Sequence, residues 1–158
     1  IMKRCIALLL VCVFAAPLAF AEEKAAKPAD NMEIVREAIQ AQKKVLIAEN
    51  MQLTQAEADA FWPVYEEYQK ELKKLTDKAL NNIKKFAENF DSMTDEVAEE
   101  IIKTHLANEG EYLKLKNSYL PKFMKVLPAT KVARYFQLEN KVDAVINYDL
   151  AAEIPLFQ

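Results

Sequence analysis

Glycine occurs once in this chain of 158 residues, at Gly110. Turns that need a positive φ usually take glycine, and loops that cradle phosphate groups need several glycines. One glycine therefore cannot supply a P-loop, a dinucleotide fingerprint or a set of tight β-hairpins. The sequence argues against nucleotide enzymes and β-sandwiches and favours an all-α fold. Within such a fold Gly110 falls inside a helical segment, where we expect a bend or the close approach of another helix.

The first residues have the pattern of a secretory signal. Lys3 and Arg4 precede an apolar run, and Ala19 and Ala21 are the small residues that signal peptidase reads. We expect residues 1–21 to be a signal peptide that is cleaved from an exported protein. A membrane anchor is the alternative, but the apolar run is shorter than the ~20 residues that span a bilayer.

Cleavage would change the composition of the mature chain. Both cysteines, Cys5 and Cys12, lie in the signal segment, so the mature chain would lack disulfides, thiolate zinc sites and cysteine nucleophiles. Loss of the two positive charges at Lys3 and Arg4 takes the formal net charge from −3 to −5. This acidic balance argues against nucleic acid as a partner.

Apolar residues at helical spacing predict four helices in the mature chain. Residues 22–31 lack this periodicity and are expected to be a flexible leader before a single all-helical domain, residues 32–158. The predicted helices are 32–50, 55–89, a third that follows Thr94 and stops at Leu127, and 129–152. We expect the third helix to be interrupted near Gly110 and again at Pro121.

Polar residues mark where two of these helices begin. Thr54 and Glu57 have the spacing of a capping box, in which each side chain accepts a hydrogen bond from a backbone N–H of the first turn. Thr94 is expected to cap the third helix. Pro63 lies inside the second helix and is expected to kink it near Phe61.

The second predicted helix is long. Residues 55–89 would span about 50 Å, whereas a compact sphere of this chain length is about 35–40 Å across. Its apolar residues step by three or four, as in a seam packed lengthwise on another helix. We expect either a bend or an elongated molecule, a long antiparallel helical hairpin whose seam is covered by a second copy in a homodimer.

The chain also has a weak internal echo. Placing Leu53-Thr54 on Leu127-Pro128 brings Phe61-Trp62 onto Tyr135-Phe136. Each half then enters a helix through a leucine-centred turn and presents an aromatic pair eight residues later. Chance similarity and a true duplication are both open.

One pair of residues has the spacing of metal ligands. His105 and Glu109 stand four apart on the third predicted helix, so both could face one metal ion. A zinc site normally needs a third protein ligand, and the chain has one His. We expect His105 to be a partly buried structural residue, between Ile101 and Tyr112, and expect no metal or other cofactor unless two copies meet here.

The sequence does not predict an enzyme. Its many carboxylates stand beside lysines on faces expected to be solvated, without a pocket that would shift their pKa values. Ser92 and Ser118, the two serines, have no catalytic motif around them.

A basic and aromatic stretch of the second predicted helix suggests a binding surface. Lysines recur at four-residue spacing, which destabilises a helix slightly and so indicates a partner. Trp and Tyr carry much of the binding energy where a surface is used. The candidate client-binding residues are Phe61, Trp62, Tyr65, Tyr68, Lys70, Lys73, Lys74 and Lys78. The alternatives are a core position for most of the aromatic residues and a structural ion pair between Glu66 and Lys70.

Three short motifs resemble the Spy/CpxP group of exported bacterial helical proteins, which is named for an LTxxQ motif. The matching segments are Leu53-Thr54-Gln55-Ala56-Glu57 before Phe61-Trp62-Pro63-Val64-Tyr65, Met93-Thr94-Asp95-Glu96, and Lys122-Phe123-Met124-Lys125-Val126-Leu127-Pro128. The likeness covers residues 33–145. Glu57 stands where the family has Gln, and the second motif reads Leu-Pro-Ala-Thr-Lys at residues 127–131.

The resemblance implies a periplasmic protein that forms an antiparallel, cradle-like homodimer. It also implies an ATP-independent chaperone, or an envelope-stress protein, that binds unfolded or partner polypeptides. A zinc-responsive branch of the family relies on His-rich segments, which this sequence lacks. The other hypotheses are a periplasmic metal-responsive sensor or buffer that uses His105 with Glu109, and a structural envelope protein.

Overall fold

The computed structural model describes residues 28–156, and these residues contain helices and no strand. The elements are α1 (Pro28–Met51), α2 (Gln55–Asn89), the short 3-10 helix η1 (Phe90–Ser92), α3 (Asp95–Val126) and α4 (Ala129–Glu153). The predicted all-α fold with four α-helices is therefore confirmed. The expected signal peptide and the leader up to residue 27 lie outside the described residues.

The helices begin and end close to the capping residues and prolines of the sequence. The Thr54 side chain accepts a hydrogen bond from the backbone N of Glu57 at 3.3 Å, and Glu57 Oε2 accepts one from the backbone N of Thr54 at 2.8 Å. Thr94 Oγ1 likewise accepts from the backbone N of Val97 at 3.4 Å. Both predicted caps are confirmed. At the first helix the structure differs, because α1 begins at Pro28, inside the predicted leader, and proline suits a first helical position.

The prediction that the third helix is interrupted is wrong. α3 is one helix that runs through both Gly110 and Pro121, and α2 likewise continues through Pro63. A Cβ added at Gly110 would meet no atom within 4 Å, so no other described helix comes close there. Glycine costs a helix only about 1 kcal/mol, which the packing of α3 on α2 can offset.

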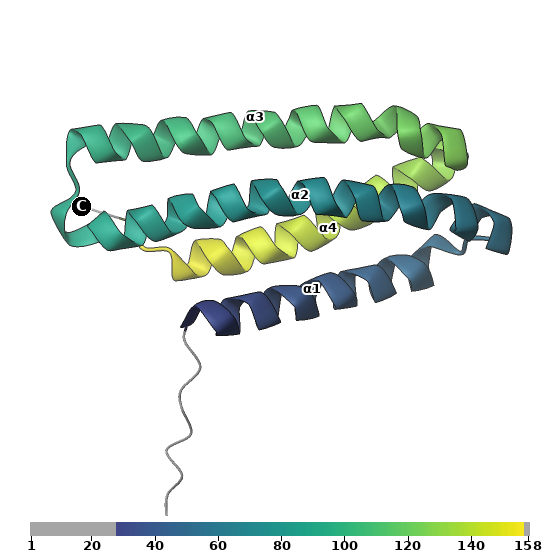
Figure 1. Cartoon of the computed structure of the whole chain (residues 1–158), viewed down its shortest axis with the longest axis horizontal. Coiled ribbons are helices and arrows are strands. Elements are labelled where there is room, and N and C mark those ends of the chain that lie inside the picture. Colours follow the sequence, from purple (N-terminus) through teal and green to yellow (C-terminus); the bar gives the residue numbers. More distant parts are fainter. Residues whose placement is uncertain (1–27, 157–158) are drawn as a thin grey trace, which may run out of the picture. The chain divides into compact units, whose positions relative to one another are not determined.

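Residues 38–156 belong to one compact unit, and within it α2 and α3 lie side by side (Figure 1). The two helices run antiparallel. Glu67, near the start of α2, contacts Lys122 near the end of α3 at 2.9 Å, and Lys78 contacts Glu111 at 2.5 Å. α4 then returns alongside α2, where Gln69 Nε2 donates a hydrogen bond to Glu139 Oε1 at 3.1 Å.

The apolar core gathers where α2, α3 and α4 meet the end of α1. Its buried residues are Ile47, Met51, Phe61, Tyr65, Tyr68, Leu72, Tyr119, Phe123, Leu127, Val132 and Tyr135. The two halves of the sequence echo face each other in this core. The rings of Phe61 and Tyr135, equivalent positions in the echo, have centroids 5.3 Å apart. Glu57 and Lys131, which are equivalent too, form an ion pair at 2.5 Å.

Candidate functional site

α3 has an exposed apolar face in addition to the face that packs on α2. Five large side chains form it, and their exposed fractions are 56% for Ile102, 63% for Leu106, 62% for Leu113, 43% for Leu120 and 48% for Met124. At 3.6 residues per turn they fall within a sector of about 40°. We call these five residues the α3 apolar face.

A row of lysines borders the α3 apolar face. Lys103, Lys114 and Lys125 are all exposed and recur every eleven residues, a spacing that returns to nearly the same side of a helix after three turns. Lys103 forms an ion pair with Glu99 at 2.5 Å, within α3. A mixed apolar and basic helix face therefore exists, but on α3 rather than on α2 where the sequence placed it.

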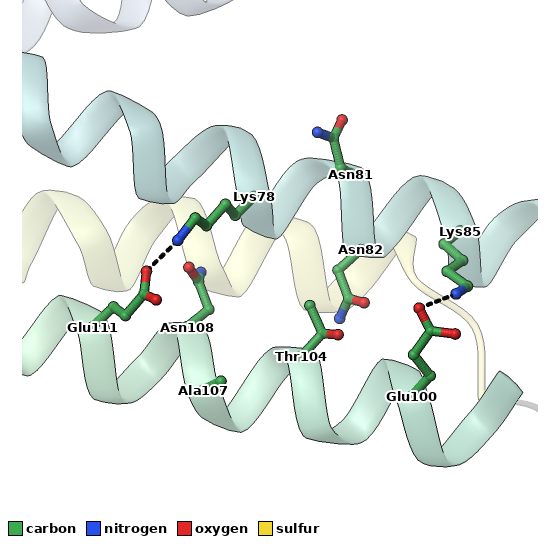
Figure 2. Close-up of a pocket in the computed structure, with 9 residues that line it drawn as sticks. All are labelled: Lys78, Asn81, Asn82, Lys85, Glu100, Thr104, Ala107, Asn108 and Glu111. Atoms are coloured by element: carbon green, nitrogen blue, oxygen red, sulfur yellow. Dashed lines mark hydrogen bonds and ion pairs between the residues drawn. The ribbon is translucent and has the colours of Figure 1, made fainter. Parts of the chain in front are cut away.

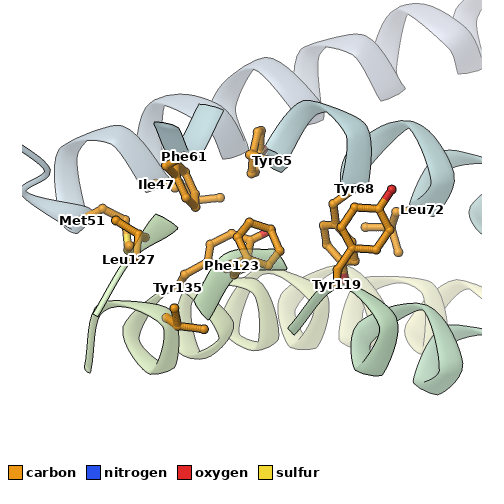
Figure 3. Packing of buried hydrophobic residues seen from close by; sticks show 11 residues of the cluster. Ile47, Met51, Phe61, Tyr65, Tyr68, Leu72, Tyr119, Phe123, Leu127 and Tyr135 are labelled. Atoms are coloured by element: carbon orange, nitrogen blue, oxygen red, sulfur yellow. The ribbon is translucent and has the colours of Figure 1, made fainter. Parts of the chain in front are cut away.

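The aromatic residues predicted to bind clients lie mostly in the core (Figure 3). Phe61 and Tyr68 are fully buried, Tyr65 is 4% exposed and Trp62 is half-buried. Phe61 packs against Phe123 with ring centroids 5.7 Å apart. Burial raises the pKa of Tyr65 and of Tyr68 well above the ordinary value. The core alternative is the one that the structure supports for these residues, so they form no open client surface in this conformation.

Some of the lysines predicted to bind clients form ion pairs within the protein. Lys70, Lys74 and Lys78 are exposed and Lys73 is half-buried. Lys74 Nζ lies 2.7 Å from Glu71 Oε2 on the same helix, and Lys78 binds Glu111 of α3. Both pairs neutralise part of the expected basic stripe, and the Lys78–Glu111 pair also joins α2 to α3.

Glu66, given above as a possible partner of Lys70, instead forms an ion pair between helices. Glu66 Oε1 accepts a hydrogen bond from Lys44 Nζ of α1 at 2.8 Å. Lys44 Nζ also lies 5.3 Å from the centroid of the Trp62 ring, in the range of a cation–π interaction. The carboxylate thus helps to attach α1 to α2.

A polar groove of about 430 Å³ lies between α2 and α3 (Figure 2). Its lining residues are Lys78, Asn81, Asn82, Lys85, Glu100, Thr104, Ala107, Asn108 and Glu111. The charged residues of the groove pair with one another, Lys78 with Glu111 and Lys85 with Glu100. Their charges are thus compensated within the protein, and the residues that line the groove form a polar contact between α2 and α3.

Two asparagines complete the contact in this groove. Asn82 Nδ2 donates to the carbonyl oxygen of Ile101 at 3.0 Å, and Asn108 Nδ2 donates to that of Leu75 at 3.2 Å. Asn108 is 6% exposed, and its buried Oδ1 has no hydrogen-bond partner. A buried amide oxygen without a donor lowers the stability of the fold.

A buried polar cluster joins α1, α2 and α4. Lys43 Nζ lies 2.5 Å from Glu139 Oε2, and their side chains are 8% and 1% exposed. Gln69 of α2 donates to the other carboxylate oxygen. Burial raises the pKa of Glu139, while the nearby Lys43 charge lowers it. The sequence pattern did not indicate this cluster, although Glu139 stands four residues after Tyr135 and Lys43 four before Ile47 on buried faces.

The candidate metal ligands are both on the surface. His105 and Glu109 are exposed, so the expectation of a partly buried His105 is wrong. His105 stands five helical turns before the buried Phe123 and so points to the same side of α3. The helical position therefore suits a buried residue, but that side of α3 is not covered at the level of His105. Within residues 28–156 no group of three or more His, Cys, Asp or Glu side chains is close enough to hold a metal ion.

Comparison with known proteins assigns no family to this arrangement. No protein-family model, curated protein or solved structure matches the chain. Across the described residues, no helix combines the length and apolar character needed to cross a membrane. The surfaces described above are therefore the basis for a functional proposal.

Proposed function

We propose that this chain is an exported, non-enzymatic protein that binds apolar segments of other polypeptides without using a nucleotide. The observation that carries the proposal is the α3 apolar face, with five large side chains between 43% and 63% exposed. Several large apolar side chains exposed on one side of a helix commonly mark a protein interaction site. A periplasmic chaperone or envelope-stress role is part of the proposal and rests on the signal pattern and the resemblance to the Spy/CpxP group.

The proposed mechanism is holding. Lys103, Lys114 and Lys125 attract acidic parts of a client, and the α3 apolar face covers apolar parts that would otherwise aggregate. Burying the exposed half of a leucine contributes roughly 1 kcal/mol. Five such side chains therefore supply about 5 kcal/mol before the entropic cost of binding. Binding of that strength is reversible, so release needs no ATP.

An aggregation assay with matched variants tests this proposal. We expect the wild-type protein at a few-fold excess to suppress aggregation of a denatured client at low salt, and Leu106→Glu/Leu113→Glu to lose most of that effect. The control is Val145→Glu/Tyr148→Glu on α4, because these two side chains are also largely exposed, at 62% and 77%. A wild-type protein without effect would refute the function, and an equal loss in the control would refute the site.

A second copy of the chain is the other candidate partner, and the spacing of the α3 apolar face favours it. Leu106 and Leu120 lie seven residues on either side of Leu113, and Ile102 and Met124 lie eleven residues on either side. A two-fold axis at Leu113 would thus place apolar side chains level with one another along two antiparallel copies, as an isologous interface requires. Five half-exposed side chains and their borders give on the order of 500 Å² per copy, close to the smallest specific interfaces.

Sedimentation alongside the aggregation assay separates these two uses of the face. If copies pair here, the wild-type protein is a dimer and Leu113→Glu is a monomer, while the α4 control remains dimeric. A monomer at all concentrations tested, or a dimer that survives Leu113→Glu, would refute pairing through this face.

A further inference from the structure

The end of α1, residues 38–51, contacts the rest of its unit through few of the side chains that the structure describes there. We call residues 38–51 the cover segment. Among residues 40–51, whose side chains the structure describes, the buried ones are Lys43, Ile47 and Met51, at 8%, 0% and 1% exposure. They recur every four residues on one side of the helix. Val45 and Leu46 between them are 56% and 39% exposed. Residues 40–51 therefore bury one stripe against their neighbours, and Lys44 beside this stripe pairs with Glu66.

Beneath this stripe lie aromatic residues. Figure 3 shows Ile47 beside Phe61, and Met51 beside Leu127. Lys44 of the cover segment lies over the ring of Trp62. Trp and Tyr are the residue types that contribute most at protein interfaces. The aromatic surface of α2 thus becomes a binding surface if the cover segment leaves it.

The connection from the cover segment to α2 is strained. Gln52, which directly follows α1, has φ of 48°, a left-handed conformation that residues other than glycine seldom adopt. Lys131 Nζ of α4 donates to the carbonyl oxygen of Gln52 at 3.3 Å. A strained residue held by one long hydrogen bond is a natural hinge, because movement of the segment relieves the strain.

The buried ion pair sets where the cover segment closes. Lys43 binds Glu139 of α4, which also accepts from Gln69 of α2. A buried ion pair adds little net stability because both charges lose water, but it penalises a wrong register. The segment is therefore positioned by Lys43 and held mainly by Ile47 and Met51.

We propose that the cover segment is a hinged cover over a second polypeptide-binding site, formed by Phe61, Trp62 and Tyr65, which opens by movement at Gln52. The ligand class follows from the shape of the cover. A site that fits one side of a helix with two apolar residues four positions apart, Ile47 and Met51, fits an amphipathic helical segment of a client in the same way. That clients are polypeptides rests on the function proposed above; the opening of the cover does not.

Trp62, the one tryptophan of the chain, reports on opening. We expect Ile47→Ala in the full chain to raise acrylamide quenching of Trp62 and to speed amide exchange in residues 38–51 about tenfold or more, with exchange in α3 unchanged. We expect Lys43→Met/Glu139→Met to lower acrylamide quenching of Trp62 and to slow amide exchange in residues 38–51, because an apolar pair replaces two buried charges. If neither variant changes quenching or exchange, or if α3 exchange rises together with α1, the cover is refuted.

A peptide of residues 38–51 tests the site beneath the cover. We expect it to bind Ile47→Ala, with a change in Trp62 fluorescence, at least tenfold more tightly than it binds the wild-type protein. The control peptide carries Ser at the positions of Ile47 and Met51, and binding of both peptides alike would refute the site. Failure of the wild-type protein in the aggregation assay would refute the proposed function while leaving the quenching and exchange results to decide the cover.

Discussion

The two ends of the α2–α3 pair are held together in different ways. At the end that includes Phe61 and Phe123, aromatic rings pack edge to face or tilted in a core shared with α1 and α4. At the other end, α2 and α3 meet through a polar groove with the ion pairs Lys78–Glu111 and Lys85–Glu100. Surface ion pairs contribute little to stability, whereas buried aromatic side chains contribute several kcal/mol each. The aromatic end should therefore carry most of the folding energy, and the polar end should open more readily.

The first prediction compares one residue from each end. Phe123 is fully buried at the aromatic end, so Phe123→Ala should lower the free energy of unfolding by about 3–5 kcal/mol. Leu80 is half-buried in the other half of α2. Leu80→Ala should therefore lower the free energy of unfolding by only about 1–2 kcal/mol. Urea unfolding of both variants measures the difference. Equal costs would show that the two ends contribute alike.

The second prediction concerns charge inside the aromatic end. Lys43→Met leaves Glu139 buried without its partner and should cost about 3 kcal/mol at pH 7.5. Burial already raises the pKa of Glu139, and Lys43 opposes that rise, so the variant should raise it further. A carboxyl group with a raised folded pKa is stabilising when protonated and loses that contribution as the pH rises.

The cost of Lys43→Met should therefore shrink between pH 7.5 and pH 4.5, as Glu139 takes up a proton. Urea unfolding at both pH values checks this, with Lys103→Met on the exposed side of α3 as the control. A cost that is the same at both pH values would show that Glu139 does not titrate in this range.

The third prediction concerns the exposed side of α3. Since a Cβ at Gly110 would meet no atom within 4 Å, Gly110→Ala should raise the free energy of unfolding by about 1 kcal/mol. Thermal unfolding and sedimentation together make the measurement. A loss of stability that accompanies loss of a dimer would instead show that another copy packs closely against Gly110.

The smallest expected effect is at the polar end. Asn108→Leu removes a buried amide oxygen that has no donor, at the cost of one hydrogen bond to the carbonyl oxygen of Leu75. We expect a gain of up to about 1 kcal/mol, because the carbonyl oxygen keeps its place in the helix ladder. Asn82→Leu is the comparison variant, and urea unfolding gives both values. A loss above 1 kcal/mol would show that the polar end depends on this amide.

Local patterns predicted the helices well. Thr54, Thr94 and Pro128 mark breaks that the structure confirms within a residue or so, because caps and prolines act on the chain beside them. The predictions at Gly110 and Pro121 were wrong, since packing against another helix can offset the cost of about 1 kcal/mol for glycine and about 3 kcal/mol for proline inside a helix. Long-range packing was also beyond the sequence pattern, and Glu57–Lys131 contact emerged only in the structure.

The candidate site was harder to predict, because α3 has apolar residues on two sides. Leu106 and Leu120 match the helical period as well as Tyr119 does, and periodicity cannot tell which side meets α2. The structure decides, with Tyr119 4% exposed and Leu106 63% exposed. The aromatic residues of α2 were chosen by residue type, and residue type does not distinguish a core from a surface.

Glu57 has one carboxylate and two structural roles. It caps the first turn of α2 through Thr54 and binds Lys131 of α4, 74 residues further along the chain. The Lys131 hydrogen bond, followed by that of Thr54, holds its pKa below the ordinary value. A local start signal and a distant contact thus depend on the same charge. Removing the Glu57 carboxylate would therefore weaken the start of α2 and its contact with α4 together.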